Sequence, residues 1–236
     1  MSEENKQAAR IQTSILNKYE KKALVWMAER MPSWVNSDML TFVGFLGACV
    51  MATGYALSNV NLMWLWLSNL GLFINWFGDS MDGSLARVRG TQRKTYGFFI
   101  DHNVDVINET IMFIGVGASP LVNMSFAMLA LVAYFMLSVY VYIDCHLKGE
   151  MRLTYGGLGP TEFRLLLVIV NTLFMYIPWF SEWKRPVTLF HNDFMVGIFD
   201  YITVAAALLL IFFYLISFFR DIKYFAKIDP VKKKEE

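Results

Sequence analysis

The sequence has few charged residues and few cysteines, and each scarcity excludes a class of protein. Only 17% of its 236 residues are Asp, Glu, Lys or Arg, whereas a soluble domain carries about a quarter. The formal net charge is +1, so no overall basic surface favours a nucleic-acid partner. Cys49 and Cys145 lie in apolar stretches, which is typical of small buried side chains and argues against a disulfide or a zinc site.

Apolar side chains are abundant instead. They make up 56% of the chain, and the mean hydropathy is +0.41. Six stretches approach the roughly 20 apolar residues that a membrane-spanning helix needs. These stretches are 39–59, 62–86, 97–118, 121–146, 161–180 and 194–219. We therefore predict an all-α integral membrane protein, a bundle of six transmembrane helices.

Charged segments flank this bundle. Residues 1–38 are expected to form an N-terminal arm and residues 220–236 a charged tail, with the membrane domain spanning 39–219. Lysines and arginines gather in the two end segments and in two of the connecting loops, whereas the opposite side would hold only Lys184 and Arg185. The positive-inside rule then places both termini in the cytoplasm.

Apolar residues recur at helical spacing within the N-terminal arm. They are Ile11, Ile15, Leu16, Tyr19, Ala23, Trp26 and Met27. This spacing predicts an amphipathic helix lying on the cytoplasmic membrane surface. A helix that packs on the same chain is the alternative.

Four aspartates interrupt the second and third apolar stretches. Asp79 and Asp82 are three residues apart, and Asp101 and Asp105 are four apart, so each pair shares one face of its helix. The short connection makes the two helices antiparallel neighbours, which gathers the four carboxylates near the cytoplasmic face. Acids within a membrane cost about 2.5–3.5 kcal/mol each even on insertion scales, and their mutual repulsion requires protons or cations.

Carboxylate oxygens are the ligands that Mg²⁺, Mn²⁺ or Ca²⁺ prefer. Two cations bridged by shared carboxylates would balance the charge and suit the transfer of a phosphate group. Gly83 and Ala86 leave room beside the acids, and Arg87 is placed to reach a phosphate. Helix packing is the alternative for the two small residues, and an interfacial position is the alternative for the arginine.

The order of these residues resembles the signature of the CDP-alcohol phosphotransferase (CDP-alcohol phosphatidyltransferase) family. The matching residues are Asp79, Asp82, Gly83, Ala86, Arg87, Gly97, Asp101 and Asp105, with nine residues instead of about eight between Arg87 and Gly97. The resemblance implies six spanning helices, a site open to the cytoplasm and a homodimer.

The resemblance also implies roles for these residues. Asp79, Asp82 and Asp101 would hold two divalent cations, Mg²⁺ or Mn²⁺, with help from Asp105, which would also act as general base on the acceptor hydroxyl. Gly83, Ala86 and Arg87 would line the site of the CDP-linked donor.

The segment that enters the fifth apolar stretch, residues 155–164, offers candidate contacts to the acceptor. Glu162 and Arg164 would lie at the cytoplasmic mouth and contact a polar head group, although helix capping is an equal alternative for Glu162. Lys148 and Arg152 would join Arg164 if the acceptor carried a phosphate. The piece 159–162 is similar to one in the choline and ethanolamine phosphotransferase branch.

Two directions of transfer remain open. Either CDP-diacylglycerol gives its phosphatidyl group to a small polar alcohol, or a donor such as CDP-choline or CDP-ethanolamine gives its head group to a lipid alcohol. The alternative class is a cation- or proton-coupled transporter that uses the buried acids. The concentration of the acids on two adjacent helices near one face favours an enzyme.

Overall fold

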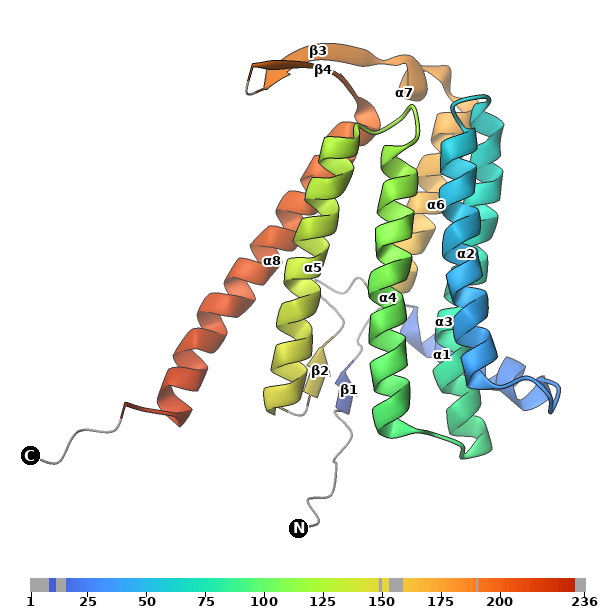
Figure 1. The fold of residues 1–236 in the computed structure, drawn as a ribbon, viewed down its shortest axis with the longest axis vertical. Coiled ribbons are helices and arrows are strands. Elements are labelled where there is room, and N and C mark those ends of the chain that lie inside the picture. Colours follow the sequence, from blue (N-terminus) through green and yellow to red (C-terminus); the bar gives the residue numbers. More distant parts are fainter. Residues whose placement is uncertain (1–8, 12–15, 149, 153–158, 190, 232–236) are drawn as a thin grey trace, which may run out of the picture.

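Six long helices dominate the part of the chain that the structure describes (Figure 1). The structure is a computed structural model and describes residues 9–11, 16–148, 150–152, 159–189 and 191–231. The long helices are α2 (Ser37–Leu57), α3 (Leu65–Arg89), α4 (Lys94–Gly117), α5 (Met124–Lys148), α6 (Pro160–Tyr176) and α8 (Ile198–Ile228). Of these, α2, α5 and α8 are long and apolar enough to cross a membrane, judged by length and composition.

Shorter elements occupy the two ends of the bundle. Helix α1 (Asn17–Arg30) and the parallel strand pair β1 (Ala9–Ile11) and β2 (Glu150–Arg152) lie near one end. The 3₁₀ helix η1 (Leu62–Trp64) precedes α3, and the short helix α7 (Pro178–Glu182) follows α6. An antiparallel hairpin of β3 (Lys184–Leu189) and β4 (Asn192–Gly197) extends across the other end (Figure 1).

Two of the predicted segments differ from the observed helices. The fifth was expected to continue to residue 180, but α6 ends at Tyr176 and Ile177 is extended, with φ −119° and ψ 95°. The cause is Pro178, since a proline disfavours the helical conformation of the residue before it. The sixth was expected at 194–219, but 194–197 belong to β4, and α8 runs from Ile198 to Ile228.

Helices α2 and α3 pack closely through glycines. A Cβ atom at Gly78 would lie 2.6 Å from the Cα of Gly44, and one at Gly47 would lie 2.8 Å from the Cα of Asn75. Small residues allow helix backbones to approach this closely in membrane proteins. The contact fixes α3, which carries two of the four aspartates, against the first turns of α2.

Helices α5 and α8 are joined by a cluster of charges. The Nζ atom of Lys148 lies 2.6 Å from Asp144 on its own helix and 2.6 Å from Asp221 on α8. Asp221 also accepts hydrogen bonds from Tyr140 and Arg220. Both acids are buried, so the pairing replaces the water that they lose.

Helix α1 packs on α3 through a narrow face. Leu24 and Ala28 are buried in a cluster with residues that include Leu40 and Met81, whereas Tyr19 is 72% exposed and Trp26 57% exposed. A helix was expected here, and Met27 of the predicted apolar face packs against this cluster. Ile11 lies in β1 instead of the helix, and Ile15 lies outside the described residues. Packing on the same chain therefore holds for the side of Leu24 and Met27, and a position on the membrane surface stays a prediction.

Candidate active site

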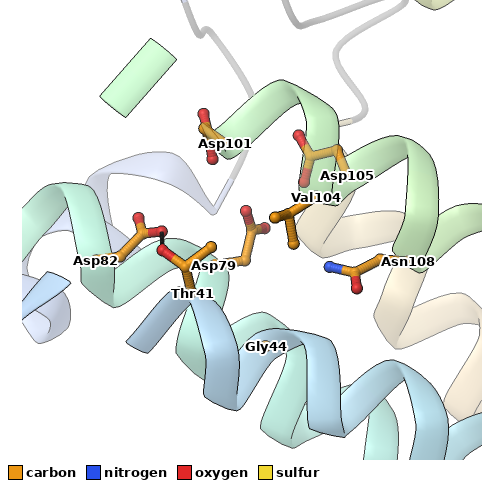
Figure 2. A pocket seen from close by; sticks show the side chains of 8 residues that line it. All are labelled: Thr41, Gly44, Asp79, Asp82, Asp101, Val104, Asp105 and Asn108. Atoms are coloured by element: carbon orange, nitrogen blue, oxygen red, sulfur yellow. Dashed lines mark hydrogen bonds between the residues drawn. The ribbon is translucent and has the colours of Figure 1, made fainter. Parts of the chain in front are cut away.

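Three of the predicted aspartates converge between α3 and α4. Asp79, Asp101 and Asp105 each offer a carboxylate oxygen, and these oxygens lie within 4.8 Å of one another. Figure 2 shows the three side chains directed into one pocket, which α2 closes with Thr41 and Gly44. The i,i+4 spacing on α4 places Asp101 and Asp105 on the face that meets α3. The structure therefore forms the acidic site that the spacing predicted.

Asp82 lines the same pocket, and its carboxylate accepts hydrogen bonds from Thr41 of α2 and from the backbone of α3. Its Oδ2 atom accepts a hydrogen bond of 2.6 Å from the hydroxyl of Thr41, shown in Figure 2, and its Oδ1 atom accepts from the N–H of Gly83. The hydroxyl of Ser37 donates to the backbone carbonyl of Asp82. The start of α2 thus orients this aspartate, and its role as a metal ligand stays a prediction.

Arg164 of α6 lies against the acids. Its Nη2 atom donates to Oδ2 of Asp79 at 3.0 Å and to Oδ1 of Asn75 at 3.0 Å. The side-chain N–H of Asn75 donates in turn to the carbonyl of Gly44. The sequence predicted this arginine at the cytoplasmic mouth in contact with a head group, and the structure places it beside the metal-ligand candidates.

Glu162 caps the helix that carries Arg164. One carboxylate oxygen accepts from the N–H of Gly159 and the other from the N–H of Leu16, each at 2.9 Å. The adjacent Thr161 donates to Glu20 of α1, which also accepts from the indole of Trp76. The capping alternative describes these contacts, and a contact of Glu162 with an acceptor stays a prediction.

The other predicted acceptor contacts are not assembled with Arg164. Lys148 is bound to Asp144 and Asp221 at the α5–α8 contact. Arg152 lies in β2, where its backbone pairs with Ile11, and its side chain lies outside the described part of the chain. No cluster of Lys148 with Arg164 is therefore present among the described side chains.

The three predicted donor contacts lie on the last turns of α3. Gly83 and Ala86 are half-buried and Arg87 is exposed. The Arg87 guanidinium folds back along the helix, where its Nη2 atom donates to Ser84, and a Cβ at Gly83 would lie 3.2 Å from its Nη1 atom. The missing side chain at Gly83 thus leaves room for the arginine beside the acids.

The residues of the pocket fit a hard divalent cation. Three carboxylates converge, and such oxygen-only ligand sets suit Mg²⁺ or Mn²⁺. Asn108 also lines the pocket, and its buried Oδ1 atom has no hydrogen-bond partner among the described residues. An amide oxygen in this state can serve as a further ligand or accept a bond from a metal-bound water.

Apolar helices around a carboxylate site define an integral membrane protein that is equipped to bind hard cations. Residues 34–209 match the family of CDP-alcohol phosphatidyltransferases, and the chain belongs to this family. Its members are transferases of phospholipid synthesis that use divalent metal ions. The protein is therefore a transferase of this kind, and the transporter alternative is set aside.

Named relatives cover more than one reaction. The chain is 27% identical over 148 residues to an archaetidylinositol phosphate synthase of Methanothermobacter thermautotrophicus, which covers 62% of this chain and 71% of that protein. It is 28% identical over 140 residues to the protein of the same name from Pyrococcus horikoshii, covering 59% of this chain and 70% of the relative. It is 25% identical over 160 residues to cholinephosphotransferase 1 of Danio rerio, which covers 63% of this chain and 40% of that protein.

Two further residues complete the site. Thr41 and Asn75 hold Asp82 and Arg164 through hydrogen bonds. Asn75 lies one helical turn before Asp79, so its place on the acidic face could be read from spacing. The partners of Thr41 and Arg164 come from other helices, 41 and 85 residues away along the chain, and no local pattern indicates them.

Proposed function

We propose that the protein transfers a substituted phosphate group from a CDP-linked donor to an alcohol hydroxyl, with release of CMP. One of the two substrates is a lipid. The convergence of Asp79, Asp101 and Asp105 between α3 and α4 supports this proposal most directly, because a phosphate transfer needs positive charge held at such a cluster. Two divalent cations, Mg²⁺ or Mn²⁺, would be held there by these three residues and Asp82.

The bound cations would supply charge stabilisation for the pyrophosphate and for the departing CMP. The chain's own residues would accept the proton and bind the donor. Asp105 would take the proton of the acceptor hydroxyl while the acceptor oxygen bonds to phosphorus and the bond from phosphorus to the CMP oxygen breaks. Gly83 and Ala86 would let the donor approach α3, and Arg87 would contact its phosphates.

The contacts of the basic residues leave both kinds of acceptor in the proposal, an uncharged alcohol and a phosphorylated one. Lys148 is bound to two acids and Arg164 is bound to Asp79, but the side chain of Arg152 lies outside the described part of the chain. The donor can be CDP-diacylglycerol, with a small polar alcohol as acceptor, or of the CDP-choline or CDP-ethanolamine type, with a lipid alcohol as acceptor. The names of the relatives point to both branches.

We further propose six membrane-spanning helices, with the acidic site and both termini in the cytoplasm, and a homodimer. Three helices meet the length and composition of a span, and α3, α4 and α6 pack among them in the same bundle. Labelling of single introduced cysteines from either side of sealed vesicles tests the orientation. Crosslinking in native membranes that gave only monomer would refute the dimer.

Release of labelled CMP by the purified protein in lipid tests the proposed reaction. The donors are CDP-diacylglycerol with pooled alcohols, and CDP-choline or CDP-ethanolamine with diacylglycerol, each with Mg²⁺ or Mn²⁺. We expect metal-dependent CMP release from one donor type, which also gives the direction of transfer.

Asp105→Asn should abolish this release and leave CDP binding largely intact, because the substitution removes the proton acceptor. Asp193→Asn, in the hairpin at the other end of the bundle, is the matched control and should release CMP at the wild-type rate. Near-normal release by Asp105→Asn would show that the assignment of the base is wrong. Absence of both CMP release and nucleotide binding in the wild type would refute the proposed reaction.

A further inference from the structure

The guanidinium of Arg164 lies against the acidic site and is held there by two residues of α3. One nitrogen atom, Nη2, bridges Asp79 Oδ2 and Asn75 Oδ1, each at 3.0 Å. The side chains of Arg164 and Asp79 are only 23% and 28% exposed. Asn75 is 2% exposed and is itself oriented by its bond to the Gly44 carbonyl. The arginine therefore has a prepared position, unlike a solvated surface side chain.

The first turn of α6 fixes the backbone from which Arg164 projects. Glu162 bonds to the N–H groups of Gly159 and Leu16. Thr161 bonds to Glu20, and Glu20 to Trp76 of α3. These contacts tie α6 to α1 and α3 within one turn of Arg164. The fixed first turn of α6 therefore places the guanidinium beside Asp79.

This position opposes the binding of a metal ion at Asp79. The carboxylate oxygens of Asp79, Asp101 and Asp105 lie within 4.8 Å of one another, and a positive charge among them lowers their repulsion. The same positive charge repels an incoming cation, and its hydrogen bond occupies one of the two carboxylate oxygens of Asp79. Attraction and repulsion between charges remain strong in the partly buried environment of the site, because less water screens them than at an exposed surface.

We propose that Arg164 is a positioning residue that pairs with Asp79 and thereby lowers the metal affinity of the acidic site. The phosphates of a CDP-linked donor, which accept hydrogen bonds from a guanidinium as a carboxylate does, then take Arg164 from Asp79. Donor and metal consequently raise each other's affinity, because linkage between two ligands is reciprocal. This inference rests on the proposed function and concerns the same site.

Mn²⁺ binding without substrate tests the inference directly. Purified protein in lipid nanodiscs is titrated with Mn²⁺, and the free ion is measured by electron paramagnetic resonance. We expect Arg164→Gln to bind Mn²⁺ about tenfold more tightly than the wild type, since removal of a nearby like charge favours the cation. Arg164→Lys keeps the charge and should stay near the wild-type affinity. Arg30→Gln, which removes an exposed arginine of α1, should leave the affinity unchanged.

A second titration measures the linkage. Saturating CDP should tighten Mn²⁺ binding in the wild type, and the factor should be several-fold smaller in Arg164→Gln. If Arg164→Gln fails to fold, Arg164→Met provides the neutral variant and retains much of the apolar stem.

The outcomes separate this inference from the proposed function. Wild-type binding of Mn²⁺ with unchanged or weaker binding in the neutral variants would overturn the role of Arg164 and leave the proposed reaction standing. If Arg164→Lys binds Mn²⁺ as tightly as the neutral variants, the role of Arg164 is also overturned, because its charge would not be what lowers the affinity. No Mn²⁺ binding by the wild type, either without CDP or with saturating CDP, would overturn both proposals.

Discussion

The hydroxyl of Thr41 on α2 donates a 2.6 Å hydrogen bond to Oδ2 of Asp82 on α3. This bond crosses the helix pair that packs most closely, and it restricts the direction of a carboxylate at the edge of the acidic pocket. Hydrogen bonds from such outer residues typically affect metal affinity or activity by about 10- to 100-fold.

Thr41→Val should therefore lower metal-dependent CMP release by about tenfold while the protein stays folded, because valine has the same shape and lacks the hydroxyl. Thr53→Val is the matched control. Thr53 donates to the carbonyl of Cys49 within its own helix and is exposed, so its loss should not change CMP release. Equal rates for Thr41→Val and the wild type would show that the orientation of Asp82 does not matter for transfer.

Gly78→Ala should destabilise the protein and disturb the site together. The new methyl group would lie 2.6 Å from the Cα of Gly44, so α2 and α3 must separate, at a cost of about 1–3 kcal/mol. Asp79 is the next residue and would move with the backbone. The melting temperature in detergent and Mn²⁺ binding check both effects. Gly97→Ala, whose added methyl group meets nothing within 4 Å, should keep the wild-type melting temperature.

Glu162→Ala should lower the melting temperature and loosen α1. The substitution leaves the N–H groups of Gly159 and Leu16 without their shared acceptor, and such a loss costs about 1–3 kcal/mol. Limited proteolysis should then cut near the start of α1 faster than in the wild type. Glu29→Ala removes an exposed glutamate of α1 and serves as control. If Glu162→Ala melted like this control, the carboxylate would not be the anchor of α6.

Lys148→Met should destabilise the α5–α8 contact more than Arg220→Met. The Lys148 side chain is 19% exposed and bridges two buried acids, whereas the Arg220 side chain is 53% exposed. Loss of one partner from a buried pair costs about 3–5 kcal/mol, because the remaining charges stay out of water. Thermal unfolding in detergent compares the two variants. An equal or larger effect of Arg220→Met would contradict the central role of the lysine.

The positions of the long helices and of the acidic site could be predicted because their signals are local. Apolar length indicates a helix in a membrane sequence, and the spacing of Asp101 and Asp105 places both on one face whatever surrounds them. The short connection between α3 and α4 then brings Asp79 opposite this pair. No part of that prediction depends on residues from distant helices.

The contacts that Arg164, Glu162 and Lys148 make with distant parts of the chain could not be predicted in the same way. Their partners are Asp79, Leu16 and Asp221. The bond of Glu162 to the N–H of Gly159 is local, and it is the helix cap that the sequence offered as an alternative. A basic or acidic residue at a helix end has similar local surroundings whether it contacts a substrate or another helix. The helix start was predicted too early because the last residues of β4, 194–197, are mostly apolar and continue directly into α8, so hydropathy alone did not separate them from the helix.

The charges that join α5 and α8 also bear on how the chain enters the membrane. Asp144 and Lys148 are one turn apart on α5, and Arg220 and Asp221 are adjacent on α8. Each of these two pairs can therefore form within its own helix, before the other helix has been synthesised. Once both are in place, Lys148 of the earlier helix reaches Asp221 of the later one. The order of synthesis and the final ion pairs are thus compatible, because neither helix depends on the other for a first partner of these charges.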